Sequence, residues 1–393
     1  MPRPRSLPVV LAGFTAFLDL YATQPLLPLL MRVFDASHVA VSLTVTAATV
    51  AVAISAPLIG RLGDLVGRKR VIVGAAFALA VVTGLAATAS SLGQFIAWRF
   101  AQGLVTPGVF AVTIAYIHDE WPARYAARGT AAYVSGTVVG GFCGRALTGL
   151  VADHAGWPTA FVALASVNLV AACAMARWLP RESPTPRPRH AGHGRSLASV
   201  LRNRQLVATD AVGFCVLFSQ VAVFSYVTFH LSAAPFSLGT AALGWLFVVY
   251  LVGALVTPLA GPWIDVHGHR AGLATAMAIG VAGAVLTLTP WLPVIVTGLA
   301  LVGTGVFIAQ ATASSYIGAV TDRDRGLAVG LYSSCYYAGG SLGAVLPALF
   351  WTTGGWTACV LLVITVQVAT GALALHFWRN VRGHAEPLPE GIS

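Results

Sequence analysis

The sequence predicts an all-α integral membrane protein, with 12 transmembrane helices in two six-helix bundles related by pseudo-two-fold symmetry. Three observations predict this fold: the composition, the number of apolar segments and an internal repeat. Of the 393 residues, 57% are hydrophobic and only 9% are charged, whereas a soluble domain carries about 25% charged residues. So few charges cannot cover a water-facing surface, and the composition therefore favours the lipid bilayer as the solvent.

A membrane-spanning helix needs about 20 mostly apolar residues. Breaks at charged residues, prolines and glycines divide the chain into segments of that kind, at roughly 9–31, 39–60, 71–90, 93–118, 129–151, 157–179, 205–231, 239–261, 271–290, 292–319, 327–352 and 356–378. The first segment follows two arginines, as in a signal peptide, but it is long and has no clear cleavage site. We therefore expect it to be retained as a helix.

The longest polar stretch, RESPTPRPRHAGHGRS (181–196), divides the chain into two halves. It is rich in proline, arginine and histidine, as linkers are. The predicted organisation is an N-terminal bundle (1–180), a linker (181–204), a C-terminal bundle (205–379) and a tail (380–393).

The basic residues predict the orientation. All lysines and arginines except Arg32, Arg99 and Arg145 fall on the side of the membrane that holds both termini and the linker. By the positive-inside rule that side is cytoplasmic. The net charge of +10 is then a signal of topology, and nucleic acid is not expected as a partner.

The two halves repeat each other. PLIGRLGDLVGRK (57–69) aligns without gaps on PLAGPWIDVHGHR (258–270), 201 positions later. PGVFAVTIAYI (107–117) similarly matches TGVFIAQATAS (304–314), and RGTAAYVSGTVVGG (128–141) matches RGLAVGLYSSCYYAGG (325–340). Parallel repeats in a membrane protein predict a substrate site near the midplane between the halves, opened alternately to each side.

Four segments resemble motifs of the major facilitator superfamily, and with the topology the resemblance covers nearly the whole chain. GRLGDLVGRK (60–69) resembles its signature loop, and RFAQG (99–103) its fourth-helix motif. GTVVGGFCGR (136–145) resembles its fifth-helix antiporter motif, with Gly141 in place of a proline and Arg145 in place of a glycine. FLDLYATQPLLP (17–28) resembles the acidic first helix of the 12-span drug/proton antiporter branch. The arabinose-efflux-permease-like bacterial exporters look most similar, which implies a bacterial inner membrane.

The resemblance implies a cytoplasmic gate at the loop after the second helix. Asp64 is expected to cap the eleventh helix near 325–330, and Arg68 to pair with Asp119 or Glu120, so that these contacts break when this side opens. The alternative is a positive-inside anchor with solvated charges. The expected gate residues are Gly60, Asp64, Gly67, Arg68, Lys69, Asp119, Glu120 and, in the second-half copy, Asp265.

Three charged residues within predicted spans form the expected proton-coupling group: Asp19, Arg99 and Arg145. Charge inside a bilayer is costly and therefore indicates function. We expect Asp19 to bind and release a proton with Arg99 as its counter-charge; the alternative is a fixed structural pair or a hydrogen bond within the helix. For Arg145 three interpretations stay open: snorkelling to the outer surface, pairing with Asp153, or facing the cavity as a site for an anionic substrate group.

Glycines and neutral polar residues complete the expected site. Gly136, Gly140 and Gly144 share one helix face, and small residues at this spacing let helices approach closely. With Gly141 they are expected to form a hinge against the eighth helix, in the other half. The expected cavity residues are Tyr21, Gln24, Gln102, Gln220, Tyr226, Gln310 and Tyr336; the alternative for any of them is interhelical hydrogen bonding or a position at the membrane interface.

These features predict a monomeric secondary active transporter, not an enzyme. It would export a small molecule (drug-like compound, sugar or metabolite) in exchange for protons by alternating access. The alternatives are a proton-coupled or facilitative importer, with Asp19 and Arg99 structural, and a lipid flippase or non-transporting sensor. No phosphate-binding loop of the type GxxxxGK[ST] occurs and the five cysteines lack metal-ligand spacing. ATP is therefore not expected as the energy source, nor a metal or other cofactor as a requirement. The resemblance to proton antiporters implies the proton as the coupling ion.

Overall fold

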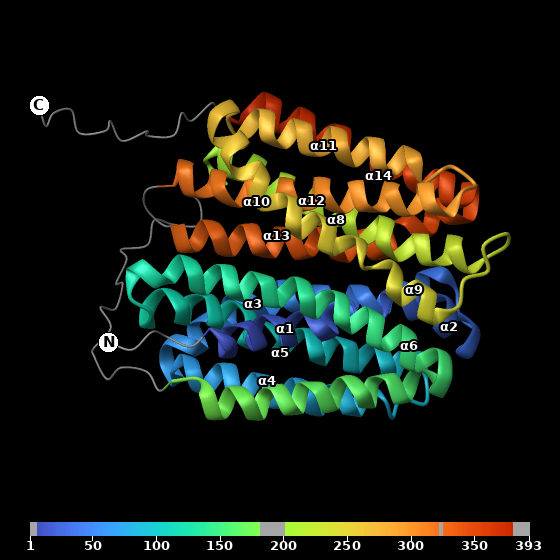
Figure 1. Cartoon of the computed structure of the whole chain (residues 1–393), viewed down its shortest axis with the longest axis horizontal. Helices are drawn as coiled ribbons and strands as arrows, with labels where there is room; N and C mark the ends of the chain where they lie inside the picture. Colours follow the sequence, from blue (N-terminus) through green and yellow to red (C-terminus); the bar gives the residue numbers. More distant parts are fainter. Residues whose placement is uncertain (1–5, 181–200, 322–324, 380–393) are drawn as a thin grey trace, which may run out of the picture.

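The computed structural model describes residues 6–180, 201–321 and 325–379. In these ranges the protein is all-helical, and the longer helices run side by side along one axis (Figure 1). The helices are α1 (Leu7–Leu20), η1 (Gln24–Leu26), α2 (Leu27–Val33), α3 (His38–Val66), α4 (Arg68–Ala86), α5 (Leu92–Glu120), α6 (Ala123–Trp178), α8 (Arg204–Ser232), α9 (Thr240–Leu246), α10 (Val249–His267), α11 (His269–Leu286), α12 (Leu292–Val320), α13 (Arg325–Val345) and α14 (Pro347–Phe377).

Ten helical segments within these ranges are long and apolar enough to cross a membrane. One of them, Arg124–Trp178, contains two helices, because Gly156 interrupts α6 with a φ of 82°. That conformation suits glycine, which has no Cβ to clash. Gly354 and Gly355 interrupt α14 in the same way. The all-helical, membrane-spanning character that the sequence predicts is confirmed for the described residues.

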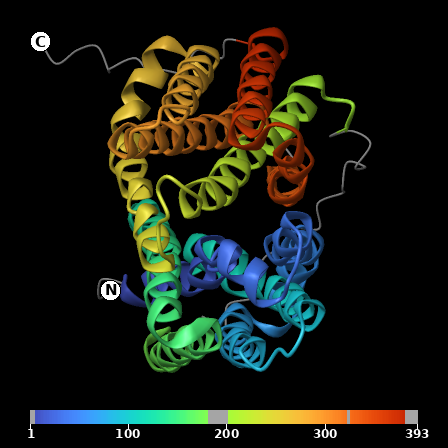
Figure 2. The ribbon, with the colours of Figure 1, turned by 90° about the vertical axis from the view of Figure 1, so that its right-hand side faces the viewer.

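Helices from the two ends of the chain form two groups that face each other (Figure 2). In the first group α1 packs on α6, and α5 packs on α3 and α4. In the second group α8 packs on α13 and α14, and α12 packs on α11. The groups meet chiefly where α3 contacts α13 and where α6 contacts α9.

Glycines produce the same close packing in both halves. A Cβ on Gly140 or Gly144 of α6 would lie 2.8 Å from the carbonyl carbon of Phe14 or Leu18 on α1. In the second half, a Cβ on Gly339 of α13 would lie 2.6 Å from the carbonyl carbon of Phe214 on α8. Because only glycine tolerates this distance, each glycine face is buried against a helix of its own half.

For Gly136, Gly140 and Gly144 the expected partner is wrong, although the fifth helix does pack on the predicted eighth span (239–261), through contacts of α6 with α9 and α10. These three glycines contact α1, in their own half, and not the eighth span. The contact with the other half lies further along α6, where a Cβ on Gly149 would be 2.8 Å from the Cα of Gly244 in α9. Glycine spacing indicates close helix packing, but the choice of partner depends on how the helix is rotated in the bundle.

Hydrogen bonds between the halves gather toward one end of the molecule. Gln24 of η1 donates to Ser225 of α8 (3.1 Å), and Thr240 of α9 donates to Asp153 of α6 (3.0 Å). These elements lie at the end remote from the described start of the chain (Figure 1). Along α3, the hydrogen bonds to α13 reach Ala53, whose carbonyl accepts from Ser334 (3.3 Å). Within the described residues, no hydrogen bond joins the part of α3 that follows Ala53 to the second half.

Candidate functional site

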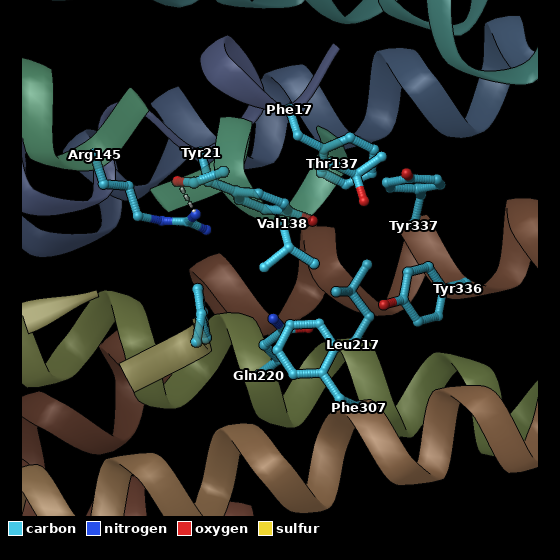
Figure 3. Close-up of a pocket in the computed structure, with 12 residues that line it drawn as sticks. Phe17, Tyr21, Thr137, Val138, Arg145, Leu217, Gln220, Phe307, Tyr336 and Tyr337 are labelled. Atoms are coloured by element: carbon cyan, nitrogen blue, oxygen red, sulfur yellow. Dashed lines mark hydrogen bonds between the residues drawn. The ribbon is translucent and has the colours of Figure 1, made fainter. Parts of the chain in front are cut away.

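A cavity lies between the two halves, and both halves line it (Figure 3). The first half contributes side chains from α1 and α6 and a residue just after α1; the second half contributes side chains from α8, α10, α12 and α13. The lining residues are Phe17, Tyr21, Thr137, Val138, Gly141, Arg145, Leu217, Gln220, Tyr250, Phe307, Tyr336 and Tyr337. Of the residues expected to line a cavity, Tyr21, Gln220 and Tyr336 are among them.

Arg145 is the one charged residue in this lining. It is 3% exposed and extends into the cavity beside Tyr21 (Figure 3). Its Nε donates to Gln24 Oε1 (2.8 Å), and its Nη1 donates to the carbonyl of Gly141 (2.6 Å). The snorkelling interpretation is therefore wrong for this structure. The pairing with Asp153 is not formed either, since that carboxylate accepts from Thr240.

Aromatic rings surround the Arg145 guanidinium. Its central carbon lies 5.0 Å from the ring centroid of Tyr21, 4.7 Å from that of Phe247 and 4.9 Å from that of Tyr250. At such distances the negative faces of the rings attract a cation. The rings stabilise the guanidinium without neutralising its charge.

Asp19 lies on the other side of α1, away from the cavity. Phe17 and Tyr21, two positions to either side, line the cavity, whereas the Asp19 carboxylate points into the first bundle and is 0% exposed. Its Oδ2 accepts from Thr83 of α4 (3.1 Å) and from Asn168 of α6 (2.5 Å). Its Oδ1 has no hydrogen-bond partner among the described residues.

The expected ion pair between Asp19 and Arg99 is not present. Arg99, also 0% exposed, donates instead to the backbone carbonyls of Asp19 (2.9 Å) and Leu20 (2.7 Å) and to Gln102 Oε1 (2.5 Å). The physical reason is that α1 ends at Leu20, and the last carbonyls of a helix lack partners within it and attract cations. The two charged side chains are joined indirectly, because Gln102 donates to Thr83 (2.7 Å), which donates to Asp19.

Four expected cavity residues lie outside the cavity lining. Gln24 bridges Arg145 and Ser225 at the contact between halves, and Gln102 is enclosed in the first bundle. Tyr226 bonds to Ser42 and to the Ala344 carbonyl, and Gln310 accepts from Tyr332 (2.7 Å). Residue type alone does not say which face of a helix looks into the cavity.

The sequence reasoning missed the apolar part of the lining: Phe17, Thr137, Val138, Leu217 and Phe307. Helical spacing was the available signal. Phe17 lies four positions before Tyr21, Gly141 lies four before Arg145, and Leu217 lies three before Gln220, so each pair shares a helix face.

The loop after α3 brings part of the expected gate together. Arg68 Nη2 lies 3.2 Å from Asp64 Oδ1 and 2.7 Å from Asp119 Oδ2. The Asp64 side chain is 65% exposed, and within the described residues its partner is Arg68 and not α13. The expected cap on the eleventh helix would lie beside residues 322–324, outside the described ranges, and stays a prediction. Side chains at 325 and 326 are outside the described part.

The remaining gate residues lie at the ends of helices or on their outer faces. Gly67 adopts a φ of 104°, and Lys69 donates to the Leu179 carbonyl (2.5 Å). Glu120 is the last residue of α5, and Asp265 is exposed on α10. A Cβ on Gly60 would meet no atom of the described residues within 4 Å.

Comparisons with known proteins agree with this architecture. The sequence model of the Major Facilitator Superfamily matches residues 9–241 and 233–391. The uncharacterized MFS-type transporter YybF of Bacillus subtilis is 30% identical over 373 residues, which cover 94% of this chain and 92% of YybF. The inner membrane transport protein YnfM of Escherichia coli is 31% identical over 367 residues, covering 91% and 88%.

The fold is also similar to that of a solved transporter. The crystal structure of the nucleoside transporter NupG superposes with a TM-score of 0.77 at 11% identity, covering 95% of this chain and all of the other. The family match extends over both halves, and the relatives span nearly the full length. This chain therefore belongs to the major facilitator superfamily and is a multi-pass membrane transporter, not an enzyme.

Proposed function

We propose that the protein is a secondary active transporter that exports a small molecule in exchange for protons by alternating access. In this proposal twelve segments span the membrane, six in each half. Gly156 marks the break between the last two spans of the first half, and Gly354–Gly355 mark the break between the last two spans of the second half. The observation that carries the proposal is a cavity lined by both halves, closed at one end by contacts at Gln24 and Asp153. Movement of one half against the other would open that end.

The charge distribution supports the orientation. The basic cluster Arg68–Lys69–Arg70 lies at the start of α4, at the end of the molecule opposite to Gln24. The positive-inside rule assigns that end to the cytoplasm. The closed end then faces outward, a state that importers and exporters share. Export, across a bacterial inner membrane, is proposed from the resemblance of residues 136–145 to the antiporter motif.

Asp19 is the proposed proton carrier. Its carboxylate is enclosed, one of its oxygens lacks a partner, and it is joined to Arg99 through Thr83 and Gln102. An unpaired buried charge is costly, so the carboxylate gains by binding a proton. The same helix carries Phe17 and Tyr21 into the cavity, and a change at Asp19 can therefore reach the substrate through α1.

Purified protein in proteoliposomes tests this proposal. With an imposed pH gradient, we expect substrate from a panel of drugs, sugars and organic acids to move against the proton flux, reported by a pH-sensitive dye. Asp19→Asn should abolish the coupling, whereas Asp35→Asn, at an exposed carboxylate outside the expected site and gate, serves as the matched control. Substrate movement that ignores the gradient, or that follows the protons, would contradict proton-coupled export.

A further inference from the structure

Arg145 carries a buried charge that no acidic residue neutralises. Within the described residues, the ion pairs between arginine and a carboxylate involve Arg68, at the far end of the first bundle. Asp19 bonds to Thr83 and Asn168, and Asp153 bonds to Thr240. A membrane protein retains an unpaired internal cation at considerable cost, which indicates a function for the charge.

We propose that the transported substrate is an organic anion with an apolar, preferably aromatic body, and that Arg145 binds its carboxylate, sulfonate or phosphate group. This proposal rests on the proposed transport function and names the substrate class for the same cavity.

The hydrogen bonds of Arg145 leave one side of the guanidinium free. The group has five N–H donors, of which one at Nε serves Gln24 and one at Nη1 serves Gly141. Nη2 donates to no described residue, and it is not among the buried polar atoms that are sealed off without a partner. Nη2 is therefore the nitrogen that remains available to a ligand in the cavity that Arg145 lines. A guanidinium edge matches the two oxygens of a planar or tetrahedral oxyanion.

The protein fixes this guanidinium in place. Gln24 and Gly141 hold two of its nitrogens, and three rings pack around its central carbon. A preorganised group loses little entropy when a ligand binds. The corresponding position in the second half is Ala344, so the site offers one cationic group and fits a substrate with one anionic group.

The rest of the lining suits a substrate with an aromatic body. The aromatic members are Phe17, Tyr21, Tyr250, Phe307, Tyr336 and Tyr337. Aromatic surfaces bind apolar or aromatic moieties by stacking and by burial of apolar area. The tyrosine hydroxyls, Thr137 and Gln220 add neutral hydrogen-bonding groups for polar substituents on that body.

An anionic substrate also changes the electrical character of the cycle. Export of a monoanion and entry of a proton both carry positive charge inward, so one cycle moves two charges. A neutral substrate exchanged for one proton moves a single charge. A membrane potential that is negative inside therefore assists both steps for an anion.

Ligand-dependent thermal unfolding of the detergent-purified protein tests the inference. The probes are benzoate, benzenesulfonate and phenyl phosphate, each compared with neutral benzamide at constant ionic strength. We expect the best of the three anions to raise the unfolding temperature with a saturating dose dependence, and benzamide to leave it unchanged.

The variants assign the effect to Arg145. Arg145→Gln should weaken the apparent affinity for the anion at least about ten-fold, the value of one charged hydrogen bond. Arg124→Gln removes an exposed arginine elsewhere and should change nothing. If Arg145→Gln does not fold, Gly141→Ala replaces it, because the new Cβ would lie 3.3 Å from Nη1, closer than an ordinary contact, and would shift that nitrogen away from its present position beside the Gly141 carbonyl. The inference is overturned if no anion stabilises the protein more than benzamide, or if these variants keep the full preference.

The transport assay separates this inference from the proposed function. Proton-coupled export of neutral compounds alone would overturn the anion site and leave the proposed function intact. Binding of anions through Arg145 without any proton coupling would support the anion site and contradict the proposed proton-coupled export.

Discussion

Replacement of Gly144 by alanine tests whether α6 and α1 approach as closely as the structure has them. The added Cβ would lie 2.8 Å from the Leu18 carbonyl carbon and closer still to its oxygen. Overpacking typically costs about 1–3 kcal/mol. The upper end applies here, because the obstacle is helix backbone and not a mobile side chain. Alanine regains about 1 kcal/mol of helix propensity, which leaves a net loss of about 2 kcal/mol.

The matched control is Gly74→Ala in α4, where a Cβ would meet nothing within 4 Å. It should keep the gain of about 1 kcal/mol. Thermal unfolding in detergent measures both variants, and we expect Gly144→Ala to unfold roughly 4 °C below the wild type and Gly74→Ala at or above it. Equal unfolding temperatures for the two variants would refute the close packing of α6 on α1.

Three further predictions address the site. Asp19→Asn should unfold within about 2 °C of the wild type, because it removes a carboxylate with an unpartnered oxygen. The number of protons moved per substrate molecule should nevertheless fall to zero. Retained coupling would exclude Asp19 as the carrier. Gln24→Leu should lose about 1–3 kcal/mol of stability, since Arg145 Nε loses its acceptor, and more than Ser225→Ala, as chemical or thermal unfolding would show. A disulfide between Asp153→Cys and Thr240→Cys, in a background without the native cysteines, should stop transport until it is reduced, whereas transport by the fully cross-linked protein would contradict alternating access at this end.

The sequence was sufficient for the helices and for the residues whose chemistry is unusual in a membrane. The apolar segments, the glycine spacing and the arginine within the apolar part of α6 all correspond to features of the structure. The glycines at 136, 140 and 144 do mediate close packing, and Arg145 does face the space between halves. These predictions succeed because composition and spacing show which groups are costly to bury, and that cost does not depend on which helix is the neighbour.

The sequence did not predict which groups the buried polar side chains contact. Arg99 was expected to seek the Asp19 carboxylate, but it binds the carbonyls at the end of α1. Those acceptors exist because the helix stops at Leu20, a boundary that residue types do not reveal. Gln102 and Tyr21 were both expected in the cavity, and the rotation of each helix places only Tyr21 there. Helix rotation is set by packing across the whole bundle, which no local pattern contains.

Lys69 and Arg270, aligned residues of the sequence repeat, form the same contact in the two halves. Lys69 donates to the carbonyl of Leu179, and Arg270 donates to that of Leu375. Each bond ties the helix that begins beside it to the final helix of the same half, so each half is fastened to itself at this end. Such a bond favours movement of each half as a rigid body in the proposed transport cycle, so that a displacement at this end would also act on the contacts of Gln24 and Thr240 between the halves.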